Sequence, residues 1–249
     1  MEPDLTPISL QESFRFSCSP DVPCFNECCR DLNQFLTPYD ILRLKNHLEI
    51  SSGEFLHNYT SRHTGPESGL PIVTLTPKDP HQLTCPFVSE NGCRVYDNRP
   101  SSCRTYPLMR AATRSRSTGE MTAQFMLLRE SHCLGFEESK NRTLQQWIDD
   151  QGVAVYNENN DKLVQIISLK NQLIPGPLDL KSSQLFYTAL YDLDNFKWQI
   201  QHNGLLDNLN VIPSVMDRAV KNDVSLLDLA LLWIEHVLSN PNGLNKHGT

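Results

Sequence analysis

The sequence lacks several features that would place it in a common class of protein. No apolar run is long enough to span a bilayer, and the first residues, MEPDLTPISLQESF, have neither the basic start nor the apolar stretch of an export signal. Lys and Arg number 22 against 29 Asp and Glu, which gives a net charge of −7. This deficit of positive charge argues against general binding to nucleic-acid phosphates. We expect a cytoplasmic protein that has neither a membrane nor a nucleic acid as its partner.

Two short motifs are missing as well. No Gly-x-Gly occurs, so the nucleotide-binding fingerprint of a doubly wound methyltransferase is absent. The Cys-x3-Cys-x2-Cys pattern of radical enzymes fails because Asp31 stands where its third cysteine would be. No Cys-x-x-Cys occurs either, although four-cysteine zinc sites usually contain such pairs. The last absence favours iron over zinc at any cysteine site.

What the chain does contain is eight cysteines. The N-terminal cysteine cluster is Cys18, Cys24, Cys28 and Cys29, and the second cysteine cluster is Cys85, Cys93 and Cys103. Cys133 follows as an isolated residue. A chain of 249 residues, 39% of them hydrophobic, can bury an ordinary core without disulfides. In a reducing compartment, clustered cysteines are more typical of metal binding than of disulfides or unligated core thiols. We therefore predict that all eight are metal ligands.

The adjacent pair Cys28 and Cys29 bears on stoichiometry. Neighbouring side chains diverge by about 100° on a helix or point to opposite faces of a strand, so adjacent thiolates rarely bind one small tetrahedral ion. One alternative is two sites of four thiolates each. The other is that the pair meets different iron atoms of one cluster, because a 4Fe–4S cluster takes four thiolates on separate irons. The expected cofactor is an iron–sulfur cluster of the 4Fe–4S type, or Zn²⁺.

Other polar residues near the cysteines are candidates for supporting roles. His81, Asp97 and His132 are candidate substitutes for one thiolate, although a lone histidine more often has a hydrogen-bonded structural role. Six arginines lie between residues 94 and 116 with a single acid among them. They form either a solvated hairpin face or a positive environment that lowers thiol pKa values and favours ligation. Arg99 and Arg104 are expected to bond sulfur or backbone groups around the site.

Local patterns predict an α+β fold that is mainly helical. Thr37 and Pro38 are typical of a helix start, and Ser51 with Glu54 forms a capping-box pattern for a second helix. The β-branched run at 72–76 predicts a strand. A hairpin is expected around a turn at residues 117–119, with its return strand at 121–128. That hairpin would bring Cys103 and Cys133, at its two roots, near each other.

The chain becomes helical in pattern from residue 143 onward. Helices are expected at 143–151, 161–173, 182–193, 195–201 and 225–240, with Gly176 as a break between the second and third. In the last helix Ser225 is the expected N-cap, with Leu229, Trp233 and Val237 on one apolar face and Leu226 and Leu232 beside them. Residues 241–249 read as a frayed tail.

These patterns together predict two regions. The first, residues 1–140, would be a cysteine-rich metal-binding domain with short strands and the hairpin. It would pack on a helical C-terminal region, residues 141–249, which is also the candidate surface for a protein partner.

The order of the cysteine motifs resembles a known family. The succession FxC, CC, CPF, GCRVY and NRPxxCRxYP, followed by an isolated cysteine, is similar to the YkgJ-type (CxxCxxCC) cysteine-cluster family, whose members are described as zinc- or iron-chelating. The resemblance covers about the first 135 residues and implies metal binding by both cysteine clusters. The N-terminal spacing, C-x5-C-x3-CC, departs from the family name and is similar to that of flagellin lysine N-methylases, which are thought to carry an iron–sulfur centre.

Three functions follow from this reading. The first is a metal- or cluster-binding protein with a role in redox chemistry or metal handling. The second is an enzyme resembling protein-lysine N-methylases and using an iron–sulfur centre. The third is a structural zinc module whose helical region binds another protein.

Overall fold

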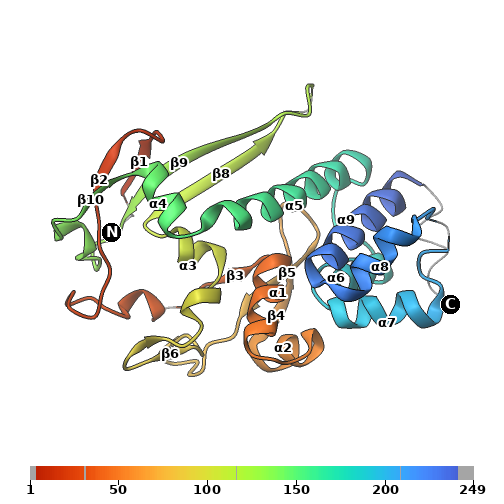
Figure 1. Cartoon of the computed structure of the whole chain (residues 1–249), viewed down its shortest axis with the longest axis horizontal. Coiled ribbons are helices and arrows are strands. Elements are labelled where there is room, and N and C mark those ends of the chain that lie inside the picture. The colour runs from red at the N-terminus through yellow and green to blue at the C-terminus, as the bar shows by residue number, and fades with distance from the viewer. Residues whose placement is uncertain (1–3, 31, 116, 208, 241–249) are drawn as a thin grey trace. The chain divides into compact units, whose positions relative to one another are not determined.

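The structure is a computed structural model that describes residues 4–240 apart from residues 31, 116 and 208 (Figure 1). It is 46% helix and 19% strand, which confirms the predicted α+β, mainly helical class. The chain forms two compact units that interleave along the sequence: residues 1–34 with 75–161, and residues 35–74 with 162–249. The predicted division near residue 140 stays a prediction. Among the described residues no helix is long and apolar enough to cross a membrane.

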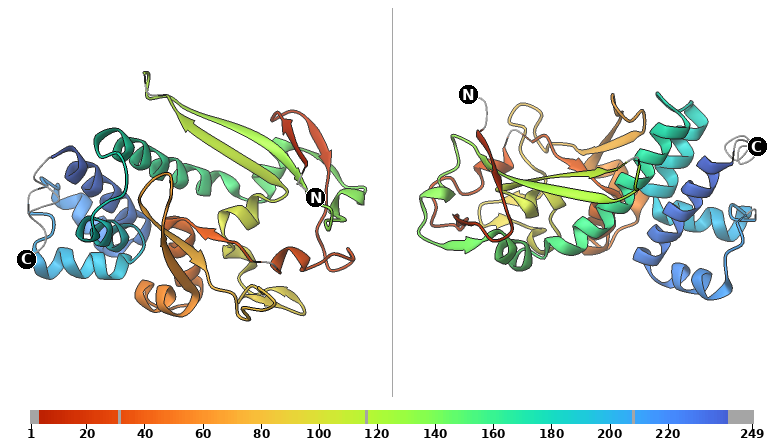
Figure 2. Two further views of the ribbon diagram at one scale, coloured as in Figure 1. Left: turned by 180° about the vertical axis from the view of Figure 1, so that it is seen from behind. Right: turned by 90° about the horizontal axis from the view of Figure 1, so that it is seen from above.

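A three-stranded antiparallel sheet belongs to the first unit. Its strands, in spatial order, are β1 (Asp4–Ile8), β9 (Met121–Arg129) and β8 (Leu108–Arg114). β8 and β9 form the predicted hairpin and run side by side in both further views (Figure 2). β1 was not predicted because DLTPI is short and contains Pro7, which interrupts a strand pattern. As an edge strand β1 tolerates that proline, since one side of it needs no ladder hydrogen bond.

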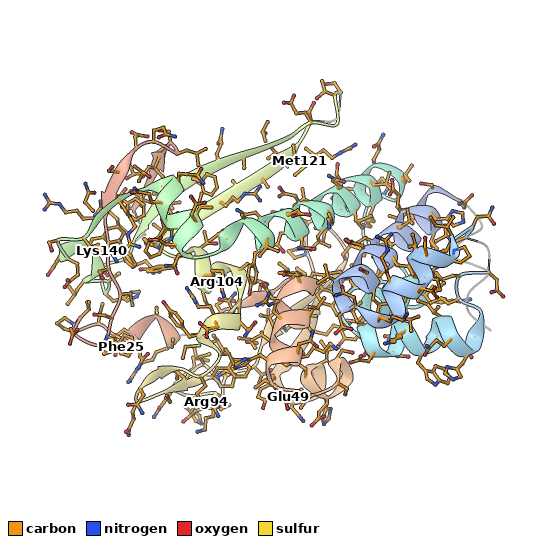
Figure 3. All side chains as sticks on the ribbon, in the orientation of Figure 1. Phe25, Glu49, Arg94, Arg104, Met121 and Lys140 are labelled. Atoms are coloured by element: carbon orange, nitrogen blue, oxygen red, sulfur yellow. The ribbon has the colours of Figure 1, made fainter. Side chains whose placement is uncertain are left out.

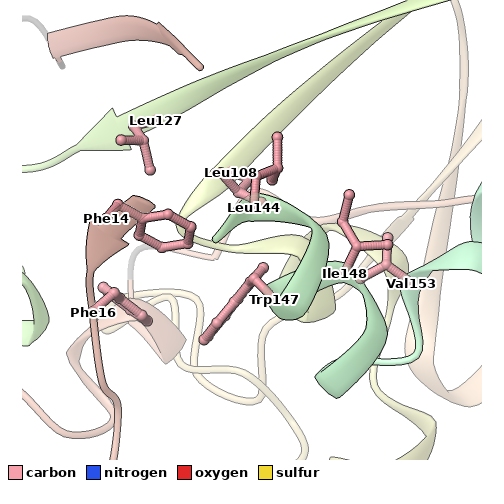
Figure 4. Packing of buried hydrophobic residues seen from close by; sticks show 8 residues of the cluster. All are labelled: Phe14, Phe16, Leu108, Leu127, Leu144, Trp147, Ile148 and Val153. Carbon is pink, nitrogen blue, oxygen red and sulfur yellow. The ribbon is translucent and has the colours of Figure 1, made fainter. Parts of the chain in front are cut away.

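Aromatic side chains form the centre of the first unit's core. Phe16 is 2% exposed and packs edge-on against Trp147 and Phe136, with ring centroids 5.4 and 5.2 Å apart. The pairing of β2 (Ser13–Arg15) with β10 (Asn141–Thr143) brings these segments together. The rest of this buried cluster is Phe14, Leu108, Leu127, Leu144, Ile148 and Val153 (Figure 4). Cys133 packs against it, so the core reaches the cysteines.

Two helices follow β10. The Thr143 hydroxyl and the Gln146 side chain form a capping box at the start of α4 (Leu144–Asp150), which was predicted. α5 (Val153–Leu173) begins eight residues before the expected start at residue 161. The segment AVYNENN contains three asparagines, which are poor helix formers and hide the helical pattern. Burial of Val153 and Tyr156 overrides that weak local preference.

The second unit combines a small sheet with helices. The sheet has the order β3 (Phe35–Leu36), β5 (Pro71–Leu75) and β4 (Thr60–Thr64), and β5 is the strand predicted at 72–76. The helices are α1 (Pro38–His47), α2 (Ser52–Tyr59), the later part of α5, α6 (Leu180–Leu190), α7 (Leu193–Asn203), α8 (Pro213–Lys221) and α9 (Asp223–Ser239). The predicted N-caps of α1 and α2 are confirmed, because Thr37 and Ser51 accept the backbone N–H of Asp40 and Glu54.

The last helix differs from its prediction at its start. Its N-cap is Asn222, whose side chain accepts the Ser225 N–H, so Ser225 lies inside the helix. Leu232 is 48% exposed, whereas Leu229 and Trp233 are 1% and 2% exposed. Leu232 lies about 100° around the helix from Trp233, which places it at the edge of the buried face. α8 was missed although Pro213 at its first turn is a start signal. The predicted tail, 241–249, lies outside the described residues.

These exposures predict different effects of two identical substitutions in α9. Leu229→Ala should lower the free energy of unfolding by about 2–5 kcal/mol, because it leaves a cavity in the core. Leu232→Ala, the matched control on the same helix, should cost much less because that side chain is half exposed. Chemical denaturation followed by circular dichroism measures both, and equal losses would contradict the burial of α9 described here.

Candidate metal centre

The N-terminal cysteine cluster lies in a chain of tight turns. The backbone N–H of Phe25 donates to the Val22 carbonyl, and that of Glu27 donates to the Cys24 carbonyl. A short 3-10 helix, η1 (Glu27–Cys29), then carries the adjacent cysteines. It begins after Asn26, whose φ of 70° is left-handed and suits asparagine better than most residues. This backbone exposes thiols at short intervals along one loop.

The second cysteine cluster is built from a small hairpin and a one-turn helix. β6 (Val88–Ser89) pairs with β7 (Gly92–Cys93), so that Val88 lies opposite Cys93. The Val88 N–H donates to the carbonyl of Cys85, which places Cys85 beside the hairpin. After η2 (Tyr96–Asn98), helix α3 (Ser101–Thr105) carries Cys103. The Cys103 thiol lies 3.3 Å from the side-chain oxygen of Gln34.

Hydrogen bonds join the two clusters directly. The backbone N–H of Cys85 donates to the Cys29 carbonyl over 2.8 Å. The Asn26 side-chain amide donates to the Ser89 carbonyl over 3.1 Å. Gly92, with φ 106°, adds a close contact, since a Cβ there would lie 3.0 Å from the Phe25 ring. Two segments more than fifty residues apart in sequence therefore form one local structure. In Figure 3 the label of Phe25 marks the loop of the N-terminal cysteine cluster, that of Arg94 marks the end of the small hairpin, and that of Arg104 marks α3.

The isolated Cys133 joins the N-terminal cluster by a different route. The Leu134 N–H donates to the Cys24 sulfur over 3.2 Å. The Ser17 N–H donates to the Gly135 carbonyl at the start of η3 (Gly135–Glu137). A side chain at Gly135 would lie 2.7 Å from the Ser17 carbonyl, so glycine permits this close approach. The structure thus brings Cys133 to the first cluster, and α3 holds Cys103 beside the Gln34 side chain.

None of the eight cysteines, all of which the structure describes, forms a disulfide. Cys18, Cys28 and Cys103 are exposed, and the others are half-buried. Among the described residues, no three His, Cys, Asp or Glu side chains are arranged closely enough to hold one metal ion. The thiols nevertheless lie within electrostatic reach of one another. Burial, and then the charges of Cys28, Cys24 and Cys133, raise the pKa of Cys18 to about 11. Their donor chemistry suits a thiophilic metal or an iron–sulfur cluster.

The adjacent thiols interact with each other. A hydrogen bond from Cys29 is the main cause that lowers the pKa of Cys28 to about 7, and the same bond raises the pKa of Cys29. The expected divergence of the two side chains does not keep their sulfurs apart. Consecutive Cα atoms are about 3.8 Å apart, so two short side chains can meet although their Cα–Cβ bonds diverge.

Backbone N–H groups donate hydrogen bonds to several of the cysteine sulfurs, and these bonds favour the thiolate form. Burial raises the pKa of Cys85, but the N–H groups of Phe87 and Val88 oppose that rise. At Cys93 burial likewise raises the pKa, and the Val95 N–H opposes that rise. At Cys133 burial again raises the pKa, while Tyr106 and the Gly135 N–H oppose it. In all three cases an N–H two residues after the cysteine makes this contact. Such a donor stabilises a negatively charged sulfur, which is the form in which cysteine binds a metal.

The arginines near the thiols have separate partners. Arg99 is 7% exposed, donates to the Tyr96 carbonyl and the Gln151 side chain, and covers the Tyr96 ring. Its charge opposes the raised pKa values of Cys93 and Cys18. Arg104 donates to the backbone carbonyls of Gln151 and Asp97. Arg99 therefore acts on the thiols, whereas Arg104 fixes the backbone beside them.

Arg110 forms a two-bond ion pair with Asp161, and Arg116 lies outside the described residues.

The candidate substitutes for a thiolate lie on the surface. His81, Asp97 and His132 are all exposed. His132 lies 3.8 Å from the Glu130 carboxylate, and the His81 N–H donates to Asp79. Sequence reasoning gave no site role to Gln34, Gln151 or Tyr106. Burial, together with the neighbouring Cys133 and Glu130, raises the pKa of Tyr106. No sequence signal marks Gln34 or Gln151, and Tyr106 is marked only as part of the NRPxxCRxYP motif. Each of the three acts across 27 to 69 residues of sequence.

One comparison with known proteins found a family match over the cysteine-bearing segment. Residues 17–134 match the model of the CxxCxxCC family, described as "Putative zinc- or iron-chelating domain". The matched segment begins one residue before Cys18 and ends one residue after Cys133, so it contains all eight cysteines. This confirms the resemblance drawn from the cysteine motifs. Searches of curated proteins and of solved structures found no significant match.

Substitution of Asn26 tests the link between the two clusters. Asn26→Gly removes the amide bond to Ser89 and should cost about 0.5–1.5 kcal/mol of unfolding free energy. Asn26→Ala removes the same bond and, unlike glycine, keeps a Cβ at positive φ without the polar side chain that lets asparagine adopt this conformation, so it should cost about 1 kcal/mol more than Asn26→Gly. Denaturation of the metal-free chain measures both variants. If alanine were no worse than glycine, the left-handed turn before η1 would be contradicted.

Proposed function

We propose that this protein holds an iron–sulfur cluster through its cysteine thiolates and acts in redox chemistry or metal handling. The observation that carries the proposal is that backbone contacts bring together three separate segments whose cysteines form no disulfide. The family match supports the coarser statement, a zinc- or iron-chelating domain. The choice of iron–sulfur over zinc is our own step and rests on spacing and geometry.

The spread of the thiols supports iron–sulfur ligation. Zinc–sulfur bonds are about 2.3 Å long, so the sulfurs around one tetrahedral zinc lie about 3.8 Å apart. The described thiols reach one another electrostatically without forming such a tight group. An iron–sulfur cluster places each thiolate on a different iron and so accommodates a wider set. The absence of any Cys-x-x-Cys pair in the sequence points the same way.

The protein's own groups would tune such a centre. N–H groups aimed at sulfur and the positive charge of Arg99 both stabilise negative charge on the ligands. The buried aromatic cluster around Phe16 excludes water behind Cys133. Exposed Cys18, Cys28 and Cys103 leave the other side open to solvent. When bound, an iron–sulfur cluster would supply one-electron chemistry at this open face.

The other two functions have less support. A structural zinc module shares the ligands and differs in the metal, so elemental analysis separates it from our proposal. The enzyme resembling lysine methylases rests on the N-terminal spacing alone, since no curated protein or solved structure matched. A protein partner for the helical C-terminal region and a cytoplasmic location both stay predictions.

Anaerobic purification tests the proposal. The full chain should be brown, with broad absorption at about 400 nm and with iron and sulfide in matching amounts. A Cys85→Ser, Cys93→Ser double variant should lose much of that absorption, and Ser89→Ala on the same hairpin is the matched control that should keep it. A colourless anaerobic protein with stoichiometric zinc would contradict the iron–sulfur assignment and favour structural zinc.

A further inference from the structure

We propose that one face of the three-stranded sheet β1-β9-β8 is a docking surface for a second copy of this chain. This outer face consists of Leu5, Pro7, Met109, Ala111, Thr113, Thr122, Gln124, Met126 and Leu128. Two copies meet there face to face about a two-fold axis and form a weak, reversible dimer. The proposal does not depend on metal binding, because none of these residues is a cysteine.

The strand register defines the outer face. Met109 of β8 lies opposite Met126 of β9, and Ala111 lies opposite Gln124. On the other side of β9, Pro7 of β1 also lies opposite Met126. Successive side chains of a strand point to opposite faces of a sheet, so these residues and those two positions away from them share one face.

The inner face of the same sheet packs on the core. Leu108 and Leu127 lie opposite each other and belong to the buried cluster around Phe14 (Figure 4). The outer face is therefore directed to solvent. Seven of its nine residues are exposed and the other two are half-buried. Even its large apolar side chains are accessible, since Leu5 is 41% and Met109 39% exposed.

The outer face carries no charged residue. An ordinary protein surface is about 25–35% charged, so about two or three charges are expected among nine positions. The solvated face of an antiparallel sheet is also normally polar. The apolar residues of this face are instead Leu5, Pro7, Met109, Ala111, Met126 and Leu128. A contiguous, exposed apolar patch of this kind is typical of an interaction surface.

Charge identifies the occupant as a second copy. The chain has a net charge of −7, so two copies repel one another electrostatically. The outer face offers a contact in which no like charges are opposed. A different protein is normally selected by complementary charges, which this face lacks. A second copy needs none, because a two-fold axis places each apolar patch on its own equivalent.

The size of the outer face sets the strength of the dimer. Nine side chains of this exposure present on the order of 500 Å² per copy, so the dimer buries roughly 1,000 Å² in total. Interfaces below about 1,200 Å² are typical of weak, transient association, whereas permanent dimers bury about 2,000 Å² or more. We therefore expect a monomer–dimer equilibrium that responds to concentration.

Sedimentation equilibrium of the full chain under reducing conditions tests the proposal. The average mass should rise from monomer toward dimer between about 10 µM and about 1 mM. Ala111→Glu, on the outer face, should raise the dissociation constant at least about tenfold, because it brings like charges together in the dimer. Ala123→Glu is the matched control, since Ala123 is exposed on the inner face of the same hairpin. It should change the constant less than about twofold.

Methyl NMR of methionine in the unsubstituted chain covers the case in which a variant alters the fold. Signals of Met109 and Met126, on the outer face, should shift with concentration. Signals of Met121, on the inner face, and of Met216, in α8, should not. The proposal is overturned if the chain stays monomeric throughout, if both glutamate variants dimerise equally, or if all four signals shift alike. A chain that stays monomeric would assign the outer face to a different protein.

Discussion

The hydrogen bond from the Cys85 N–H to the Cys29 carbonyl is the contact on which the candidate metal centre depends most. It joins two loops that have little regular structure of their own and are separated by 55 residues. A loop gains stability by satisfying its backbone groups, and here each cysteine loop satisfies the other. The Asn26 amide and the Phe25–Gly92 contact reinforce the same junction. The position of the thiols is therefore set by backbone pairing.

The aromatic core gives this junction a rigid support. Phe16 immediately precedes the segment that carries Cys18, and it is enclosed by Trp147, Phe136 and Tyr106. Trp147 comes from α4, Phe136 from η3 and Tyr106 from the C-terminal end of α3. A single buried cluster thus fixes the approach of several cysteine-bearing segments. This packing gives a physical reason for the FxC motif, because the buried phenylalanine fixes the backbone that carries the cysteine two residues later.

The sequence predicts local features of this fold better than distant ones. The hairpin, the capped starts of α1 and α2, helix α4 and strand β5 were predicted because their signals lie within a few residues. β1 was missed because its formation depends on pairing with β9. The start of α5 was missed because burial of Tyr156 stabilises a segment with weak helical preference. At the site, the cysteines are evident from composition, whereas Gln34, Gln151 and Tyr106 are recruited by tertiary contacts. The backbone bond from the Cys85 N–H to the Cys29 carbonyl, which joins the two cysteine clusters, is likewise a contact that no spacing encodes.

Electrostatics explains why such a group of thiols needs a cation. Burial and mutual repulsion raise the pKa values of Cys18, Cys85, Cys93 and Cys133, so each disfavours the thiolate form. Arg99 and the N–H groups of Phe87, Val95 and Gly135 offset part of that cost. The chain as a whole is negative, with a net charge of −7, and adds no general compensation. Eight adjacent thiolates become favourable only when positive charge lies among them, because a metal ion or cluster replaces the lost protons. The fold therefore brings thiols of separate segments near one another, and a bound metal would supply the charge balance.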